Sequence, residues 1–309
     1  MYLGIDTSNY TTSVAGLTVG LSHFSLRTPI PVAAGARGIR QSDAVFEHVR
    51  ALPPLVDRTF LLCDSKPAAI AVSNKPRDAD QSYMPCFIPG VSTAQTIAAA
   101  LSVPLYTLSH QRGHVLAALY GANRLDLLSS EFAAFHVSGG TTELLMIELD
   151  KCGDGEIRIL CSSADLNAGQ LIDRCGIMLG FPFPCGAELE RLAENGSPIL
   201  APIRFRPSDS INLSGLENKF AKHLTEACPA DAALWLLNSV ASALCAMAEF
   251  ALHIRTSVPL LLAGGVLSNK RIQSQLGAHF ETIAVSSEYA TDNAIGCSLY
   301  AALQMGVLE

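Results

Sequence analysis

The sequence lacks the features that mark secreted, membrane-spanning and disulfide-stabilised proteins. Its nine cysteines include no CxxC pair and follow no regular spacing, and their number is odd, so we expect reduced thiols. No cationic start precedes an apolar segment, and no apolar run reaches the roughly 20 residues needed to cross a bilayer. We therefore predict a cytoplasmic protein with no membrane partner.

Charge is also scarce. Only 16% of the residues are charged, the net charge is −7, and 49% of the residues are hydrophobic. This composition excludes a disordered chain, which needs low hydrophobicity and high charge. It also excludes a generally basic surface, so any nucleic-acid partner must meet a local patch or a separate subunit. The 309 residues suffice for one large core or two medium ones.

Short apolar strands alternate with helices, which predicts α/β lobes with covered sheets. Residues 2–6 and 13–19 flank a polar turn, as do residues 132–137 and 143–149, and the repeated unit indicates an internal duplication. We expect further strands at 68–72, 105–108, 259–263 and 282–285, irregular structure at 22–40 and 73–90, and helices at 41–62 (interrupted at Pro53 and Pro54), 92–102, 110–121, 168–179, 187–194, 216–227, 231–254 and 292–304.

Two histidines follow the strand expected at 105–108. His110 and His114 are four residues apart, so they share one face if a helix begins at 110. This spacing lets two imidazole nitrogens reach one metal ion. Asp292, also between a strand and a helix, is a candidate third ligand, and two histidines with one carboxylate suit iron or zinc. The alternative is a chance pair of histidines on an exposed helix.

Polar turns that follow apolar strands are candidate phosphate loops. Their hydroxyls and backbone N–H groups can cradle anions, and ligands of α/β folds bind at the carboxyl ends of strands. A lone Gly-Gly is more often a turn or a helix cap, but paired turns on duplicated units indicate an actin-like fold that clamps phosphates. The candidate residues are Asp6, Ser8 and Thr11, the turn at 138–142, and Gly264 and Gly265.

The stretch from Asp165 to Arg174 allows two interpretations. Asp173 could accept hydrogen bonds from ribose hydroxyls. Alternatively, Asp165 caps a helix and Asp173 pairs with Arg174 on the surface. From the residues alone we favour the second interpretation.

In their order along residues 2 to about 300, the motifs resemble the universal tRNA threonylcarbamoyladenosine transferase family. The motifs are Ile5-Asp6-Thr7-Ser8, His110-xxx-His114, Val137-Ser138-Gly139-Gly140, Asp165 to Asp173, Pro184-Cys185-Gly186, Leu213-Ser214-Gly215-Leu216, Ala263 to Asn269 and Thr291-Asp292-Asn293-Ala294. The resemblance implies the two-lobed α/β superfold of actin-like ATPases and sugar kinases (ASKHA), with duplicated RNase H-like subdomains. We expect one lobe at 1–108 with about 293–309, and another at 109–292 with a helical insertion.

The same resemblance implies an activity and its site. The family transfers a threonylcarbamoyl group from an acyl adenylate to N6 of adenosine in tRNA. It therefore implies a tRNA-modifying acyltransferase with one divalent metal (iron or zinc), an adenine nucleotide or acyl adenylate as ligand, and partner proteins of a threonylcarbamoylation complex. By resemblance, His110, His114 and Asp292 are the metal ligands, and the substrate and nucleotide contacts are His136, Val137, Ser138, Gly139, Gly140, Asp173, Gly186 and Asn269.

The chain also departs from the family pattern. Thr141 stands where the family has histidine, and Glu217 where it has lysine. The family's Gly-Pro-Gly loop is replaced by Asn74-Lys75-Pro76-Arg77 and a longer segment to Gly90. Two alternatives therefore stay open: a carbamoyltransferase with another acceptor, and a non-catalytic nucleotide-binding partner of the tRNA-modifying complex. A protease would need a water-activating glutamate beside the histidines, and a kinase would need a catalytic aspartate outside the metal set.

Overall fold

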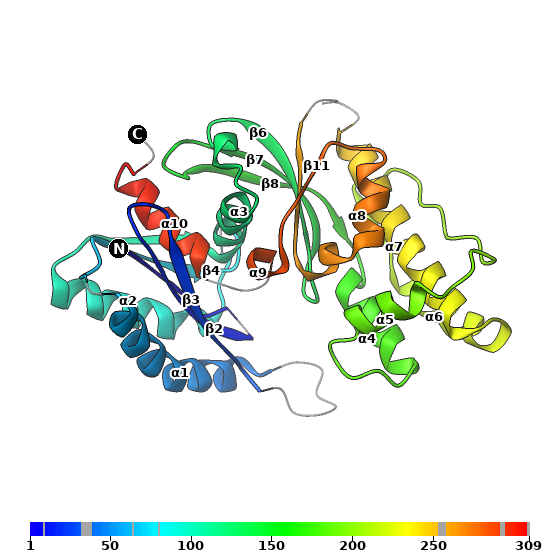
Figure 1. The fold of residues 1–309 in the computed structure, drawn as a ribbon, viewed down its shortest axis with the longest axis horizontal. Helices are drawn as coiled ribbons and strands as arrows, with labels where there is room; N and C mark the ends of the chain where they lie inside the picture. The colour runs from blue at the N-terminus through cyan, green and yellow to red at the C-terminus, as the bar shows by residue number, and fades with distance from the viewer. Residues whose placement is uncertain are drawn as a thin grey trace. The chain divides into compact units, whose positions relative to one another are not determined.

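A computed structural model describes residues 1–8, 10–31, 39–63, 65–79, 81–252, 258–290 and 294–307 (Figure 1). Its contacts divide the chain into two compact units: unit 1 comprises residues 1–130, 148–157 and 288–309, and unit 2 comprises residues 131–147 and 158–287. From the sequence we expect residues 109–130 in the second lobe, and this division into lobes stays a prediction. The contacts group these residues with unit 1. Asp292 lies outside the described residues.

Unit 1 contains a five-stranded sheet of order β3-β2-β1-β4-β5. Its strands are β1 (Tyr2–Asp6), β2 (Thr11–Leu17), β3 (His23–Pro29), β4 (Ala69–Lys75) and β5 (Leu105–Ser109). β1 pairs antiparallel with β2, which confirms the first hairpin, while β1, β4 and β5 run parallel. β3 lies in the stretch expected to be irregular. As an edge strand with half-buried and exposed side chains, it needs no strong apolar pattern.

Helices cover both faces of this sheet. The covering helices are α1 (Gln41–Leu62), α2 (Ile88–Leu101), α3 (His110–Gly121) and α10 (Ile295–Gln304). Three short helices accompany them: η1 (Pro85–Phe87), η2 (Leu125–Leu127) and α9 (Ser287–Ala290). α1 does not restart at its two prolines: the helix continues through Pro53 and Pro54, whose exposed positions let water satisfy the freed carbonyls. A kink at these prolines stays a prediction. α2 begins at Ile88, inside the stretch expected to be a loop. α10 packs directly on β1, since a Cβ at Gly4 would lie 2.3 Å from the carbonyl oxygen of Ala294.

Unit 2 is built on a six-stranded sheet of order β11-β10-β6-β7-β8-β9. Its strands are β6 (Glu131–Val137), β7 (Thr142–Leu149), β8 (Gly155–Ser163), β9 (Ser210–Ile211), β10 (Leu260–Ala263) and β11 (Thr282–Ala284). The order β8-β7-β6-β10-β11 repeats the order β3-β2-β1-β4-β5 of unit 1. This repetition is the duplicated architecture expected from the sequence. Residues 148–157, at the tip of the β7–β8 hairpin, group with unit 1.

The helices of unit 2 enclose a large apolar core. They are α4 (Ala168–Met178), α5 (Gly186–Ala193), α6 (Ser214–Glu226), α7 (Pro229–Leu252), η3 (Gly265–Ser268) and α8 (Lys270–Gly277). α7 is long and apolar enough to cross a membrane by length and composition, but 72% of its most apolar window is buried, and it forms the centre of this core. None of the nine cysteines, all in described residues, forms a disulfide, and Cys86, Cys161, Cys175, Cys185 and Cys297 are buried.

Candidate active site

The histidine pair lies at the start of α3, directly after β5. The Ser109 hydroxyl oxygen accepts a hydrogen bond from the backbone N–H of Arg112 at 3.0 Å and caps the helix, so α3 begins at His110. One turn later, Nε2 of His114 lies 2.9 Å from Nε2 of His110. The two imidazoles therefore share one face of the helix, as their spacing predicts.

Asp6 orients the first histidine. Nδ1 of His110 lies 3.1 Å from Oδ1 of Asp6, whose side chain is almost fully buried at the end of β1. An ionised carboxylate only accepts, so the proton of this bond lies on Nδ1, and Nε2 of a neutral His110 presents its lone pair. The hydroxyl of Ser8 donates to Asp6 at 2.8 Å, and the hydroxyl of Ser73, at the end of β4, also donates to it. The carboxyl ends of β1, β4 and β5 thus converge on this carboxylate.

The donor set suits a divalent metal. Two nitrogen ligands about 2.0–2.1 Å from one ion lie about 2.9 Å apart at a right angle, and about 3.3–3.4 Å apart at a tetrahedral angle. The observed 2.9 Å between the Nε2 atoms of His110 and His114 is the length of a hydrogen bond between the two imidazoles, and it places both nitrogens within reach of one ion. A carboxylate behind a ligating histidine is the usual support of such a site. The described residues contain no group of three or more candidate ligands, and the predicted third ligand, Asp292, lies outside them.

The candidate phosphate turn of unit 1 is tight and largely occupied by its own contacts. The backbone N–H of Thr11 donates to the carbonyl of Ser8 at 3.0 Å. Ser8 directs its hydroxyl to Asp6. Thr7 is fully buried, and its hydroxyl oxygen has no hydrogen-bond partner in the described part of the chain. The turn therefore supports the histidine site through Asp6 and Ser8.

In unit 2, the turn after β6 meets the start of α4. The Ser138 carbonyl accepts the N–H of Gly169 at 3.2 Å, and its hydroxyl accepts the N–H of Gly140 at 3.2 Å. A Cβ at Gly169 would lie 2.6 Å from the backbone nitrogen of Gly139, so only glycine allows this approach. At Gly139 and Gly140 themselves, no described atom lies within 4 Å of an added Cβ. Packing among the described residues does not require glycine at positions 139 and 140. A ligand that lies close to the backbone at these positions would require glycine there.

The Gly-Gly pair after β10 lies beside the same turn. β10 runs parallel to β6, with Ala263 opposite His136. Gly264 has φ +105°, and its added Cβ would lie 2.2 Å from the carbonyl oxygen of Val137. Gly265 has open space around its Cβ position. The carboxyl ends of β6 and β10 therefore bring the predicted residues of both loops together.

The residues assigned to adenosine form one neighbourhood around α4, α5 and α8. Oδ1 of Asp173 accepts the N–H of Cys185, just before Gly186, at 2.8 Å. Burial raises the pKa of Asp173, and this hydrogen bond opposes the rise. Oδ1 of Asn269 accepts two N–H groups at 3.1 Å and caps α8, and Glu190 of α5 accepts the N–H at the first residue of α8 at 2.8 Å. The oxygen of the Asn269 side chain is therefore used by the cap of α8.

Asp165 does not cap the helix that follows it, because the N-cap of α4 is Asn167; it caps α6 instead. Its carboxylate accepts the N–H of Leu213 at 2.8 Å and both the N–H and the hydroxyl of Ser214. Burial raises the pKa of Asp165, but these hydrogen bonds outweigh it and the pKa falls. Arg174 pairs with Glu217 at 3.0 Å, so the residue that replaces the lysine of the resembled family has a partner of opposite charge.

Comparisons with known proteins show the family of this chain. The family model described as TsaD, tRNA N6-adenosine threonylcarbamoyltransferase, matches residues 27–297. The chain belongs to this family. The protein named tRNA N6-adenosine threonylcarbamoyltransferase from Carboxydothermus hydrogenoformans is 31% identical over 94% of this chain and 88% of its own length. The protein of the same name from Aromatoleum aromaticum is 32% identical over 89% of this chain and 81% of its own length.

Solved structures show the fold. Component A of the (R)-2-hydroxyglutaryl-CoA dehydratase of Acidaminococcus fermentans aligns with a TM-score of 0.58 at 15% identity, covering 100% of this chain and 99% of that one. HypF of T. kodakarensis aligns with a TM-score of 0.59 at 14% identity, covering 99% of this chain and 47% of that one. The fold is therefore that of the actin-like ATPases and sugar kinases.

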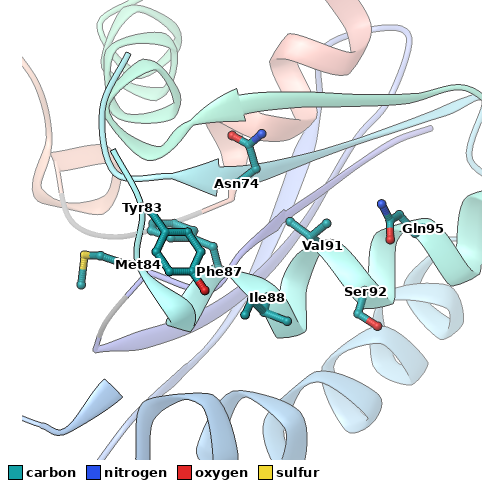
Figure 2. Close-up of a pocket in the computed structure, with 8 residues that line it drawn as sticks. All are labelled: Asn74, Tyr83, Met84, Phe87, Ile88, Val91, Ser92 and Gln95. Carbon is teal, nitrogen blue, oxygen red and sulfur yellow. The ribbon is translucent and has the colours of Figure 1, made fainter. Parts of the chain in front are cut away.

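Residues between 74 and 95 line a groove in unit 1 (Figure 2). The groove has a volume of about 280 Å³, and its lining residues are Asn74, Tyr83, Met84, Phe87, Ile88, Val91, Ser92 and Gln95. At one end, the ring of Phe87 lies 6.2 Å, centroid to centroid, from the ring of His110. The buried ring of Phe87 thus lies between this groove and His110.

Two contributions to the site were not predicted from the sequence. The support of His110 by Asp6 joins residues 104 positions apart, and the only available signal was that both follow strands of one parallel sheet. Arg112, between the two histidines, binds Asp78 and the tip of the β7–β8 hairpin. The position of Arg112 inside the HxxxH motif is the one sequence signal of its role near the histidines. Its hydrogen-bond partners cannot be identified from the sequence.

Proposed function

We propose that this chain is an acyltransferase that moves a threonylcarbamoyl group from its adenylate to N6 of adenosine in tRNA. The histidine pair carries the proposal: two Nε2 atoms lie 2.9 Å apart, with a buried carboxylate behind one of them. Membership of the family supports the acyl group and the tRNA acceptor. The protein would act in the cytoplasm, alone or with partner proteins of a threonylcarbamoylation complex.

His110 and His114, with Asp292 as the predicted third ligand, would hold one divalent metal. Two histidines with one carboxylate suit iron or zinc. When bound, the ion would supply Lewis-acid stabilisation of phosphate charge. Asp6 keeps the proton of His110 on Nδ1, so that the ligating nitrogen stays available.

Unit 2 would bind the adenylate. The backbone at Gly139, Gly140 and Gly265 is open to a phosphate or ribose, because no described atom occupies the space above these glycines. Asp173 and the amide of Asn269 would contact the adenosine, with Gly186 allowing close approach. In the reaction, the N6 amine bonds to the carbamoyl carbon while the bond from that carbon to the phosphate oxygen breaks. AMP leaves with the electron pair, and the amine proton passes to solvent.

A second candidate keeps the chemistry but changes the acyl group or the acceptor. The groove beside His110 is apolar and is formed by the segment that replaces the family's Gly-Pro-Gly loop. A pocket lined by Tyr83, Met84 and Phe87 would select an apolar substituent, although by only about 1–3 kcal/mol per methylene. The third candidate function is that of a non-catalytic nucleotide-binding partner. In that case unit 2 would bind the nucleotide and the histidine pair would have no role.

The test is transfer from threonylcarbamoyl adenylate, labelled in the carbamoyl carbon, to unmodified tRNA. We expect the iron-loaded protein to label adenosine at N6, as detected by mass spectrometry of the digested tRNA. His114→Ala should abolish transfer, and His279→Ala, an exposed histidine of unit 2, should retain it. Consumption of the adenylate without labelled tRNA would favour another acceptor. Binding of AMP without consumption of the adenylate would favour the non-catalytic partner.

A further inference from the structure

Arg112 occupies the position midway between the two histidines on α3. Its side chain is only 9% exposed, and its guanidinium group makes four contacts. Nε and Nη2 lie 3.0 and 2.8 Å from Oδ2 of Asp78, Nη1 donates to the carbonyl of Gly153 at 2.5 Å, and Nη2 donates to the carbonyl of Gly155 at 2.8 Å. All of these groups belong to unit 1. The contacts use the fork geometry that distinguishes arginine from lysine.

The two carbonyl acceptors are held in place by contacts that do not involve Arg112. Gly153 and Gly155 have φ values of +79° and +131°, which glycine adopts without strain. The neighbouring Asp154 accepts a hydrogen bond from the hydroxyl of Tyr300 at 2.5 Å and another from Gln304 at 2.7 Å, so α10 anchors the hairpin tip. The tip is therefore anchored to α10 as well as to Arg112.

The carboxylate acceptor comes from the segment that departs from the family pattern. Asp78 lies within residues 74–90, three residues after the end of β4. The same segment also contacts α3 through its backbone, because the carbonyl of Pro76 accepts the N–H of Gln111 at 3.0 Å. Two adjacent residues in the first turn of α3 are thus tied to one segment.

Stability alone does not explain this arrangement. A buried ion pair contributes little net stability compared with apolar residues of the same size, although removing one partner is costly. What the contacts do specify is the position and rotation of the first turn of α3. His110 and His114 lie two residues to either side of Arg112, so their rings follow that rotation.

We propose that Arg112 and Asp78 are positioning residues for the histidine pair. Their contact, together with the hairpin tip, holds α3 so that the Nε2 atoms of His110 and His114 face one another. The inference rests on the proposed metal site. In this chain, the segment that replaces the family's Gly-Pro-Gly loop supports the histidine helix.

Two conservative variants test the proposal. Arg112→Lys keeps the charge but loses the fork, and Asp78→Asn keeps the shape but loses the charge. The matched control is Asp126→Asn, which weakens another Arg–Asp contact of unit 1: Nε of Arg124 lies 2.9 Å from Oδ1 of Asp126 at the surface. Circular dichroism establishes that each variant is folded. A variant that does not fold is replaced by Arg112→Gln or Asp78→Ser.

Three readouts are compared with those of the wild type. Hydrogen exchange of the amides at 111–115 should become about tenfold faster or more in both variants, because the first turn of α3 opens more often. The nitrogen NMR spectra of the two imidazoles should lose the single Nδ1-protonated form of His110. The Zn²⁺ affinity, measured by calorimetry, should fall about 10- to 100-fold. Asp126→Asn should stay within twofold of the wild type in all three.

Unchanged exchange and unchanged imidazole spectra would overturn the proposal. Faster exchange with unchanged spectra and unchanged Zn²⁺ affinity would also overturn it, since the contact would then stabilise the helix without positioning the histidines. If the wild type binds neither Zn²⁺ nor Fe²⁺, the proposed metal site is wrong. The imidazole spectra of the variants then still decide whether Arg112 and Asp78 set the geometry of the pair.

Discussion

Replacing Asp6 with asparagine should weaken metal binding without unfolding the protein. The carboxylate accepts Nδ1–H of His110 at 3.1 Å and the hydroxyls of Ser8 and Ser73. An asparagine has one acceptor oxygen and an NH₂ group that can only donate. Ser8 donates to Oδ2, whereas Ser73 and His110 both contact Oδ1. If the amide oxygen keeps the bond to Ser8, the NH₂ group takes the place of Oδ1 and faces Nδ1 of His110. The proton of His110 then moves to Nε2, which removes the lone pair that would bind the metal.

The size of the effect follows from the role of the carboxylate. Loss of a partner behind a ligating histidine lowers metal affinity about 10- to 100-fold, or about 1.4–2.7 kcal/mol. Titration calorimetry with Zn²⁺ measures this change directly, and nitrogen NMR of His110 reports the tautomer. Asp231→Asn is the matched control, because Asp231 is a buried carboxylate of unit 2 that accepts one backbone N–H. A Zn²⁺ affinity of Asp6→Asn within twofold of the wild type would refute the reasoning.

Three further predictions concern stability. Burial lowers the pKa of His48 to about 4, against the opposing effect of Asp6, so the unfolded chain binds a proton there at higher pH than the folded one. As the pH falls from about 6.5 to 4, urea titrations should show the wild type losing up to about 3 kcal/mol relative to His48→Gln, and a constant difference would contradict this. Gly264→Ala should lower the unfolding free energy by about 2–4 kcal/mol, because an added Cβ meets a carbonyl oxygen at positive φ. Gly265→Ala, where the space is open, should change the unfolding free energy by less than about 0.5 kcal/mol. Equal effects of the two variants would contradict this prediction. Asp165→Ala should cost about 1–2 kcal/mol through the lost cap of α6 and leave AMP affinity unchanged, and weaker AMP binding would place Asp165 in the nucleotide site.

The sequence predicted the elements with a strong local pattern. The hairpin of β1 and β2, the start of α3 at His110 and the buried strand β10 follow directly from apolar runs and polar turns. The strands β3 and β8 were missed, because their partly exposed side chains leave only a weak pattern. α1 was expected to break at its two prolines, but tertiary packing of its buried face outweighs the loss of two backbone hydrogen bonds.

For the candidate site, the sequence predicted the positions of the key residues but not their partners. The spacing of His110 and His114 placed both imidazoles on one helical face, and the repeated strand–turn–strand units placed the loops after β6 and β10 at one sheet edge. The partners of these groups could not be predicted. Asp6 reaches His110 across 104 residues, and Arg112 reaches Gly153 across 41, and such contacts depend on how the strands are ordered in space.

The most direct test is an anomalous-scattering map at the iron edge, from crystals grown with Fe²⁺ and AMP. We predict one strong peak about 2.0–2.3 Å from Nε2 of both His110 and His114, with Asp6 still bonded to Nδ1 of His110. Two imidazoles bonded to each other with no peak between them, or a peak bound elsewhere in the chain, would contradict the proposed metal site.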